Sequence, residues 1–132
     1  MELKEFYNRL SEQDRALFMT ISDVIHLMDK TVNSTVGDVM GKEGLVFNQD
    51  GVFKYGLVKT QKHYTFHSMV MYAFPDTIEE FKAGSKGIKF QKGCFNFSSA
   101  DRLDLDLFEA FIEKSAEKDF TPIVKKYQAK RK

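Results

Sequence analysis

The sequence has little of what marks secreted or membrane proteins. It contains one cysteine, Cys94, so no internal disulfide can form and the chain suits a reducing compartment. Its longest apolar run, residues 69–74, has six residues, whereas a membrane helix needs about 20. The start of the chain is charged from Glu2 onward and lacks the apolar stretch of a secretory signal. We therefore expect a cytoplasmic protein with no membrane partner.

The sequence also lacks a large excess of charges of one sign. Lys and Arg number 20 and Asp and Glu number 19, for a formal net charge of +1. Because nucleic-acid binding draws on an excess of positive charge, we expect no nucleic-acid partner. A basic tail at about residues 125–132 is the one local concentration of cations. It is typical of a solvated helix end whose cations complement the helix dipole.

The apolar content is sufficient for one core. Hydrophobic residues make up 42% of the chain and charged residues 30%, a balance that excludes an intrinsically disordered protein. A chain of 132 residues buries roughly two-thirds of its unfolded surface when it folds. We expect residues 1–132 to form a single domain.

Apolar residues recur every three or four positions near both ends of the chain, which predicts helices. Residues 3–10 form a short one, and a capping box at residues 11–14 opens a longer helix that runs to about Lys30. Toward the other end, a second capping box at residues 106–109 predicts another helix start, and Pro122 begins a last helix.

Strands are predicted in the middle of the chain. Residues 45–47 and 52–59 flank a three-residue hairpin loop, Gln49 to Gly51, in which glycine suits a left-handed conformation. A third strand is predicted over residues 63–74 and ends at Pro75.

A second hairpin follows, and the position of its turn can be tested against the alternation of apolar and polar residues. With Lys92 and Gly93 in a two-residue turn, Phe90 lies opposite Phe95, and one face of the pair is apolar while the other is polar. Residues 31–42 are assigned to no element. The order of elements predicts an α+β fold, with an antiparallel sheet of about five strands packed against N- and C-terminal helices.

Alternation sorts the central strands into two faces, both rich in apolar residues. The first face is predicted to hold Leu45, Phe47, Phe53, Tyr55, Leu57, His67, Met69 and Met71. The second is predicted to hold Val46, Lys54, Val58, Tyr64, Phe66, Val70 and Tyr72. Helices would cover one face, and the other would be a groove or a contact with a second copy of the chain.

Four segments together resemble a known family. They are residues 50–57, 62–69, 92–97 and 104–107, and in this order they resemble the YdhG-like family of small bacterial proteins. That family is a domain of unknown function, sometimes labelled an intracellular iron chaperone with frataxin-like activity. The resemblance covers residues 15–118 and implies a compact α+β fold without an established enzyme activity.

One segment departs from this resemblance. Many relatives carry Gly-Met-Pro before the first hairpin, whereas residues 39–42 contain no proline here. Any function tied to that rigid loop does not carry over to this chain.

The leading hypothesis is a small binding or carrier domain without catalytic activity or cofactor. Its partner would be a small molecule or a protein, including a second copy in a homodimer. Two contact regions are predicted, one on the apolar face and one at the tip of the second hairpin. The residues are Tyr55, His67, Met69 and Tyr72 on the face, and Lys92 and Cys94 at the tip.

Two other hypotheses depend on charged or nucleophilic groups. Hard cations prefer carboxylate oxygens, so an acidic run would bind iron weakly in an intracellular iron chaperone. Its ligands would be Asp101, Asp104, Asp106 and Glu109. Alternatively, the ammonium of Lys92 would lower the pKa of the neighbouring Cys94 thiol and support a thiol enzyme.

A further hypothesis is a site for a soft metal ion on one strand face. His67, Met69 and Met71 at a spacing of two would offer an imidazole and two thioethers to Cu(I). Core packing is the simpler explanation, with His67 hydrogen-bonded to a neighbour such as Tyr55, because no second arm supplies further ligands.

Overall fold

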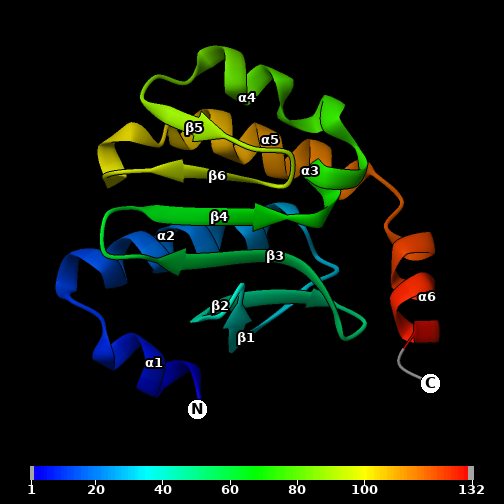
Figure 1. Cartoon of the computed structure of the whole chain (residues 1–132), viewed down its shortest axis with the longest axis horizontal. Helices are drawn as coiled ribbons and strands as arrows, with labels where there is room; N and C mark the ends of the chain where they lie inside the picture. The colour runs from blue at the N-terminus through cyan, green and yellow to red at the C-terminus, as the bar shows by residue number, and fades with distance from the viewer. Residues whose placement is uncertain (1, 131–132) are drawn as a thin grey trace.

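The computed structural model describes residues 2–130 and contains one sheet with helices packed around it (Figure 1). The elements are α1 (Leu3–Arg9), α2 (Glu12–Met28), β1 (Asn33–Val39), β2 (Lys42–Gln49), β3 (Val52–Lys59), β4 (Tyr64–Ser68), α3 (Met69–Ala73), a 3-10 turn (Pro75–Ile78), α4 (Glu79–Gly84), β5 (Ile88–Phe90), β6 (Cys94–Phe97), a second 3-10 turn (Ala100–Arg102), α5 (Leu105–Glu117) and α6 (Thr121–Lys130). None of the helices within residues 2–130 has the length and apolarity needed to cross a bilayer.

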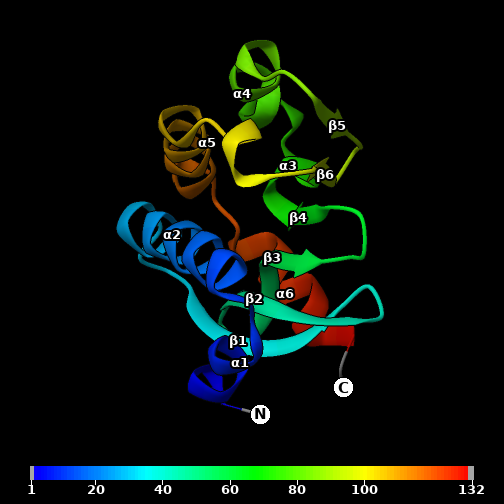
Figure 2. The same cartoon turned by 90° about the vertical axis from the view of Figure 1, so that its left-hand side faces the viewer.

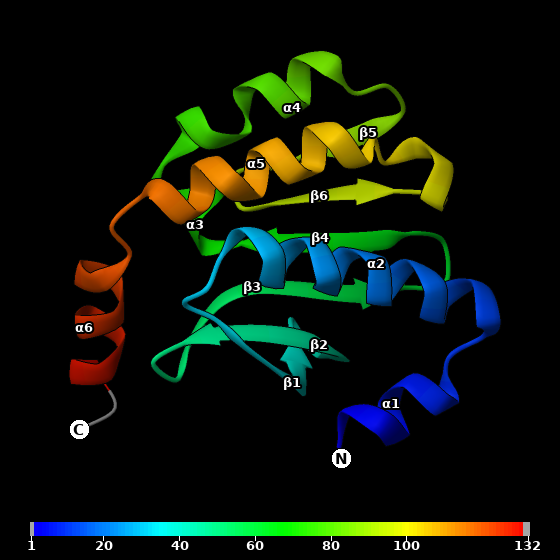
Figure 3. The ribbon, with the colours of Figure 1, turned by 180° about the vertical axis from the view of Figure 1, so that it is seen from behind.

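The predicted α+β fold is confirmed. The sheet has the strand order β1-β2-β3-β4-β6-β5, and every neighbouring pair is antiparallel. It has six strands rather than about five, because β1 forms from the segment that was assigned to no element. Helices α2 and α5 lie side by side across one face of the sheet (Figure 3), and no helix covers the front of the sheet in Figure 1.

The main core lies between the sheet and these two helices. Its aromatic centre is Phe66 on β4, whose ring meets that of Phe108 on α5 edge to face at a centroid distance of 5.2 Å. Other buried members of the core are Phe18, Ile21, Ile25, Leu45, Phe47, Tyr55, Leu57, Phe95, Phe97, Phe111 and Ile112. Each such side chain contributes about 1.5–3 kcal/mol when it leaves water, so burial on this face is the dominant stabilising term.

The second hairpin has the predicted register. Ile88 pairs with Phe97 and Phe90 with Phe95, and the backbone N–H of Gln91 donates to the carbonyl of Cys94 at 2.8 Å. A local turn and a strict alternation therefore sufficed to place these strands.

The third strand is shorter than predicted. It ends at Ser68, whose hydroxyl accepts a hydrogen bond from the backbone N–H of Met71 at 3.0 Å and so caps α3. Met69, Met71 and Tyr72 therefore lie on a helix, and their assignment to alternating strand faces is wrong. A continuous apolar run is compatible with either element, and the serine cap decides for the helix.

The register of β4 also reverses its predicted faces. Tyr55 pairs with Ser68 and Leu57 pairs with Phe66, which puts Phe66 on the core face together with Tyr55. His67 pairs with Gly56 and lies on the opposite face, so the expected contact between His67 and Tyr55 is wrong. The hydroxyl of Tyr55 instead donates to Asp29.

A bulge in β3 exchanges the predicted faces of two more residues. Phe47 pairs with Tyr55 while Asn48 pairs with Phe53, so Lys54 is an extra residue without a partner on β2. Phe53 consequently packs on the open face and Lys54 is buried on the core side, the reverse of simple alternation.

One predicted helix start is shifted. The N-cap of α5 is Asp104, whose carboxylate accepts from the backbone N–H of Leu107 at 3.1 Å. Asp106 lies in the first turn, where its charge complements the helix dipole without capping. The first capping position is as predicted, because Ser11 accepts from the N–H of Asp14.

The hairpin of β1 and β2 curls over the open face, on the side away from α2 and α5 (Figure 2). Val39 there approaches two glycines, since a Cβ on Gly44 or Gly56 would lie 3.2 Å from its methyl groups. A Cβ on Gly44 would also lie 2.6 Å from the carbonyl oxygen of Leu57. The hairpin turns at Met40 and Gly41, whose φ values of 50° and 89° are those of a type I′ turn.

Candidate functional site

The curled hairpin and the start of α3 enclose a cavity of about 350 Å³ on the uncovered face of the sheet. We call it the open-face groove. Its lining residues are Asp38, Val39, Met40, Phe53, His67, Ser68, Met69, Tyr72 and Gly93. Cavities of this size suit small organic molecules, and a mainly apolar wall with few polar groups is typical of such sites.

Each wall follows from a local feature of the chain. The type I′ turn holds Met40 over the face, and a hydrogen bond of 3.2 Å from the N–H of Gly41 to the carboxylate of Asp38 fixes the turn. The bulge directs Phe53 onto the open face. Ser68 begins α3, which places Met69 and Tyr72 on the opposite wall.

Two large apolar side chains lie exposed at the mouth of the groove. The exposed fraction is 83% for Met40 and 51% for Tyr72. The Tyr72 ring is not free on all sides, because the ammonium of Lys92 lies 4.7 Å from its centroid. The mouth thus combines a flexible thioether, an aromatic ring and a cation.

His67 is one of the polar side chains that line the groove, together with Asp38 and Ser68. It is half-buried, and no group of residues 2–130 hydrogen-bonds its imidazole. Burial lowers the pKa of His67 below its ordinary value of 6.5, so the ring is neutral at pH 7. A neutral imidazole offers one donor and one acceptor to a molecule in the groove.

The predicted contact residues separate into three groups. His67, Met69 and Tyr72 line the groove, and Lys92 reaches its mouth through Tyr72. Cys94 pairs with His67 across β4 and β6 and shares its face of the sheet, but it does not line the groove. Tyr55 lies on the core face and has no exposed surface, so its predicted place beside the others is wrong.

Several groove residues were missed from the sequence. Asp38 and Val39 belong to a strand that was not predicted, Met40 belongs to the turn that follows it, and Phe53 was assigned to the wrong face. A glycine signal was available, because Gly44 and Gly56 are the positions at which Val39 of the hairpin approaches the sheet closely.

Cys94 is not an activated nucleophile. Burial raises the pKa of its thiol, and the thiol donates to the side-chain oxygen of Gln91 at 3.1 Å. The Lys92 ammonium, which was expected to lower this pKa, lies over Tyr72 instead. The expected low-pKa thiolate is therefore wrong.

The carboxylates of the acidic run near the start of α5 have separate local roles. Asp104 caps the helix, Asp101 accepts a hydrogen bond from Ser99, and Asp106 is exposed in the first turn. Glu109 lies one turn further along α5. Within residues 2–130, no three His, Cys, Asp or Glu side chains come close enough together to hold a metal ion.

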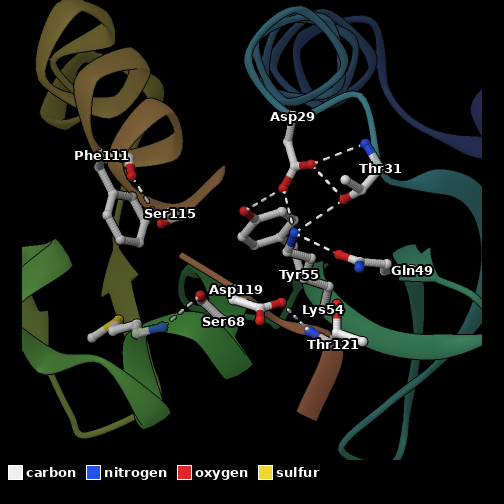
Figure 4. A network of polar contacts seen from close by, with 11 residues as sticks. Asp29, Thr31, Gln49, Lys54, Tyr55, Ser68, Phe111, Ser115, Asp119 and Thr121 are labelled. Atoms are coloured by element: carbon white, nitrogen blue, oxygen red, sulfur yellow. Dashed lines mark hydrogen bonds and ion pairs between the residues drawn. The ribbon is translucent and has the colours of Figure 1, made fainter. Parts of the chain in front are cut away.

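A buried polar network around Asp29, Lys54 and Tyr55, which sequence reasoning missed, lies on the core side of the sheet (Figure 4). The Lys54 ammonium lies 2.8 Å from a carboxylate oxygen of Asp29 and donates to Gln49 at 2.8 Å and to Thr31 at 3.0 Å. The hydroxyl of Tyr55 donates to the same carboxylate at 2.8 Å. All three ammonium protons therefore have acceptors.

The carboxylate of Asp29 is stabilised in its charged form although the side chains of Asp29 and Lys54 have almost no exposed surface. Burial alone would raise the pKa of Asp29, but the hydrogen bonds from Lys54 and Thr31 and the charge of Lys54 lower it below its usual value. Burial and the Asp29 charge raise the pKa of Tyr55. None of these groups lines the open-face groove, and we assign them a structural role, which is to hold the bulge.

Comparisons with protein-family models, with curated proteins and with solved structures find no match to this chain. The resemblance of its four segments to the YdhG-like family therefore stays a prediction.

Proposed function

We propose that this protein is a binding or carrier module that takes a small, mainly apolar molecule into the open-face groove. The observation that carries the proposal is a half-buried His67, which no group of residues 2–130 hydrogen-bonds, in the wall of a cavity lined mainly by apolar side chains. Core packing explains the aromatic rings on the covered face, but it does not explain exposed Met40 and Tyr72 around an unpaired imidazole.

The ligand would be held by three kinds of contact. Phe53 and Tyr72 offer aromatic faces, and Met40 and Met69 offer flexible thioether chains that adapt to different shapes. His67 supplies a single hydrogen bond that orients a polar group of the ligand. A binding role needs no catalytic activity, as the YdhG-like resemblance implies, and the single cysteine suits a cytoplasmic location.

Fluorescence of a neutral probe, N-phenylnaphthylamine, tests the proposal. We expect saturable binding with micromolar affinity to the wild-type protein and its loss in Met69→Trp, whose indole fills the groove. The matched control is Met19→Trp on α2, which is exposed on the helical side and should leave binding unchanged. Absence of saturable binding, or equal binding by both variants, would refute the proposal.

A further inference from the structure

A second cavity of about 260 Å³ adjoins the open-face groove. It lies between α6, the start of β3 and the start of α3, and we call it the α6 cavity. Its lining residues are Val52, Phe53, Met69, Tyr127 and Lys130. Phe53 and Met69 line both cavities, so the two spaces meet at this pair of side chains.

The shared wall is adaptable. Both residues are only partly buried, and methionine is an unbranched side chain with three rotatable bonds. Because Met69 belongs to both linings, a change of its rotamer alters the wall between the two cavities, and we call the two cavities together the channel. The channel runs from the β1–β2 turn, past Phe53, to the last turn of α6.

The two ends of this channel differ in charge. Lys130 is the charged residue of the α6 cavity, and no carboxylate of residues 2–130 forms an ion pair with it. Asp38 is the charged residue of the open-face groove. An anionic group is therefore attracted to the Lys130 end and repelled from the Asp38 end, while the walls between them are apolar.

We infer that the ligand is a linear single-chain amphiphile with an anionic head group, of the fatty-acid type. Its carboxylate pairs with Lys130, and its chain passes Phe53 and Met69 and ends beneath the β1–β2 hairpin. This inference rests on the proposed function and names the class of ligand for the same groove. Charge complementarity at Lys130, combined with an elongated apolar channel, selects this occupant over a compact aromatic molecule.

Competition by three matched ligands tests the inference. Dodecanoate, dodecanol and dodecylammonium, used below their micelle concentrations, share one chain and differ in the head group. We expect dodecanoate to displace the neutral probe at about two- to five-fold lower concentration than dodecanol, the range for an exposed ion pair, with dodecylammonium weakest. Octanoate should bind more weakly than dodecanoate, because a shorter chain buries less apolar surface.

Two charge-reversal variants on α6 complete the test. Lys130→Glu should reverse the order of the acid and the amine, whereas Lys126→Glu should preserve it, since Lys126 is exposed on the same helix and lines neither cavity. If head-group charge has no effect and dodecanol still displaces the probe, the amphiphile inference is overturned while the proposed groove stands. If neither the probe nor any of these ligands binds, both fail.

Discussion

Asp29, just past the end of α2, and Lys54, in the bulge of β3, form an ion pair with an N···O distance of 2.8 Å and almost no exposed surface on either side chain. The pair turns Lys54 toward the helices and leaves the preceding residue, Phe53, on the open face. One wall of the groove therefore depends on a contact made on the other side of the sheet.

Removing the cation from this pair should be strongly destabilising. Lys54→Met leaves the Asp29 carboxylate buried without its positive partner, and we expect the free energy of unfolding to fall by about 3–5 kcal/mol. Urea denaturation measures the change. Lys114→Met is the control, because Lys114 pairs with Glu80 and both side chains are exposed, so its loss should cost much less than the loss of Lys54. Equal losses in the two variants would contradict the assigned role of the buried pair.

The curl of the hairpin should depend on Gly44. In Gly44→Ala the new methyl group would lie 2.6 Å from the carbonyl oxygen of Leu57, a backbone atom that cannot rotate away. We expect a loss of more than about 2 kcal/mol in unfolding free energy, as is typical of steric strain between backbone and side chain. Gly37→Ala is the matched comparison, because its new methyl group meets only a side-chain methyl of Val46 at 3.2 Å. A smaller effect at Gly44 than at Gly37 would refute this account.

Met40 should show a trade-off between stability and binding. Its φ of 50° is unfavourable for most side chains but is tolerated by asparagine, so Met40→Asn should raise the unfolding free energy by about 0.5–1 kcal/mol. The same change removes an apolar side chain from the groove and should weaken binding of the neutral probe. Thermal unfolding and probe titration measure the two effects. A variant that is both less stable and unchanged in binding would contradict the assignment.

Binding of the neutral probe should weaken at low pH because His67 becomes protonated. The pKa of His67 lies below 6.5 because burial disfavours the imidazolium, and an apolar ligand buries the ring further. The neutral ring is therefore the binding-competent form, and affinity should be constant near pH 7 and fall as the pH drops through the pKa of the free protein. Asp38 also faces the groove, so the control is His67→Gln, in which this fall should disappear. A fall that persists in His67→Gln would assign the effect to another group.

Cys94 should alkylate slowly. Because burial raises the pKa of the thiol, the reaction with iodoacetamide should proceed through a smaller thiolate fraction than that of an unfolded thiol at the same pH. The pH dependence of the rate in the folded protein and in urea provides the comparison. Lys92→Ala should leave the folded rate unchanged, since that ammonium lies over Tyr72. Fast alkylation of the folded protein near neutral pH would revive the thiol-enzyme hypothesis.

Local signals predicted the elements that form locally. Helix α2 follows from a long apolar period and the Ser11 cap, and the β5–β6 hairpin from its turn and alternation. Strand β1 was missed because it has little alternation and forms by pairing with β2. The bulge at Lys54 could not be predicted, since its cause is Asp29, which is distant in the sequence.

The groove shows the same division between local and distant causes. His67, Met69 and Tyr72 were predicted from the sequence to share a contact region on one continuous strand, whereas the structure brings them together at a strand-to-helix junction. The opposite wall, at Val39 and Met40, depends on the curl of a hairpin that the sequence pattern did not reveal. Some residues of the groove could therefore be predicted from the sequence. The shape of the groove, which depends on the curled hairpin, could not.

The curl of β1 and the shortness of β5 have a consequence for self-association. These are the two outermost strands of the sheet, and their unpaired backbone groups would otherwise recruit another chain by strand addition. Strand β1 bends away from a straight template, and β5 spans three residues with a lysine at its centre. Contacts between folded copies are therefore expected through side-chain surfaces, and edge-to-edge polymerisation of the native protein is disfavoured.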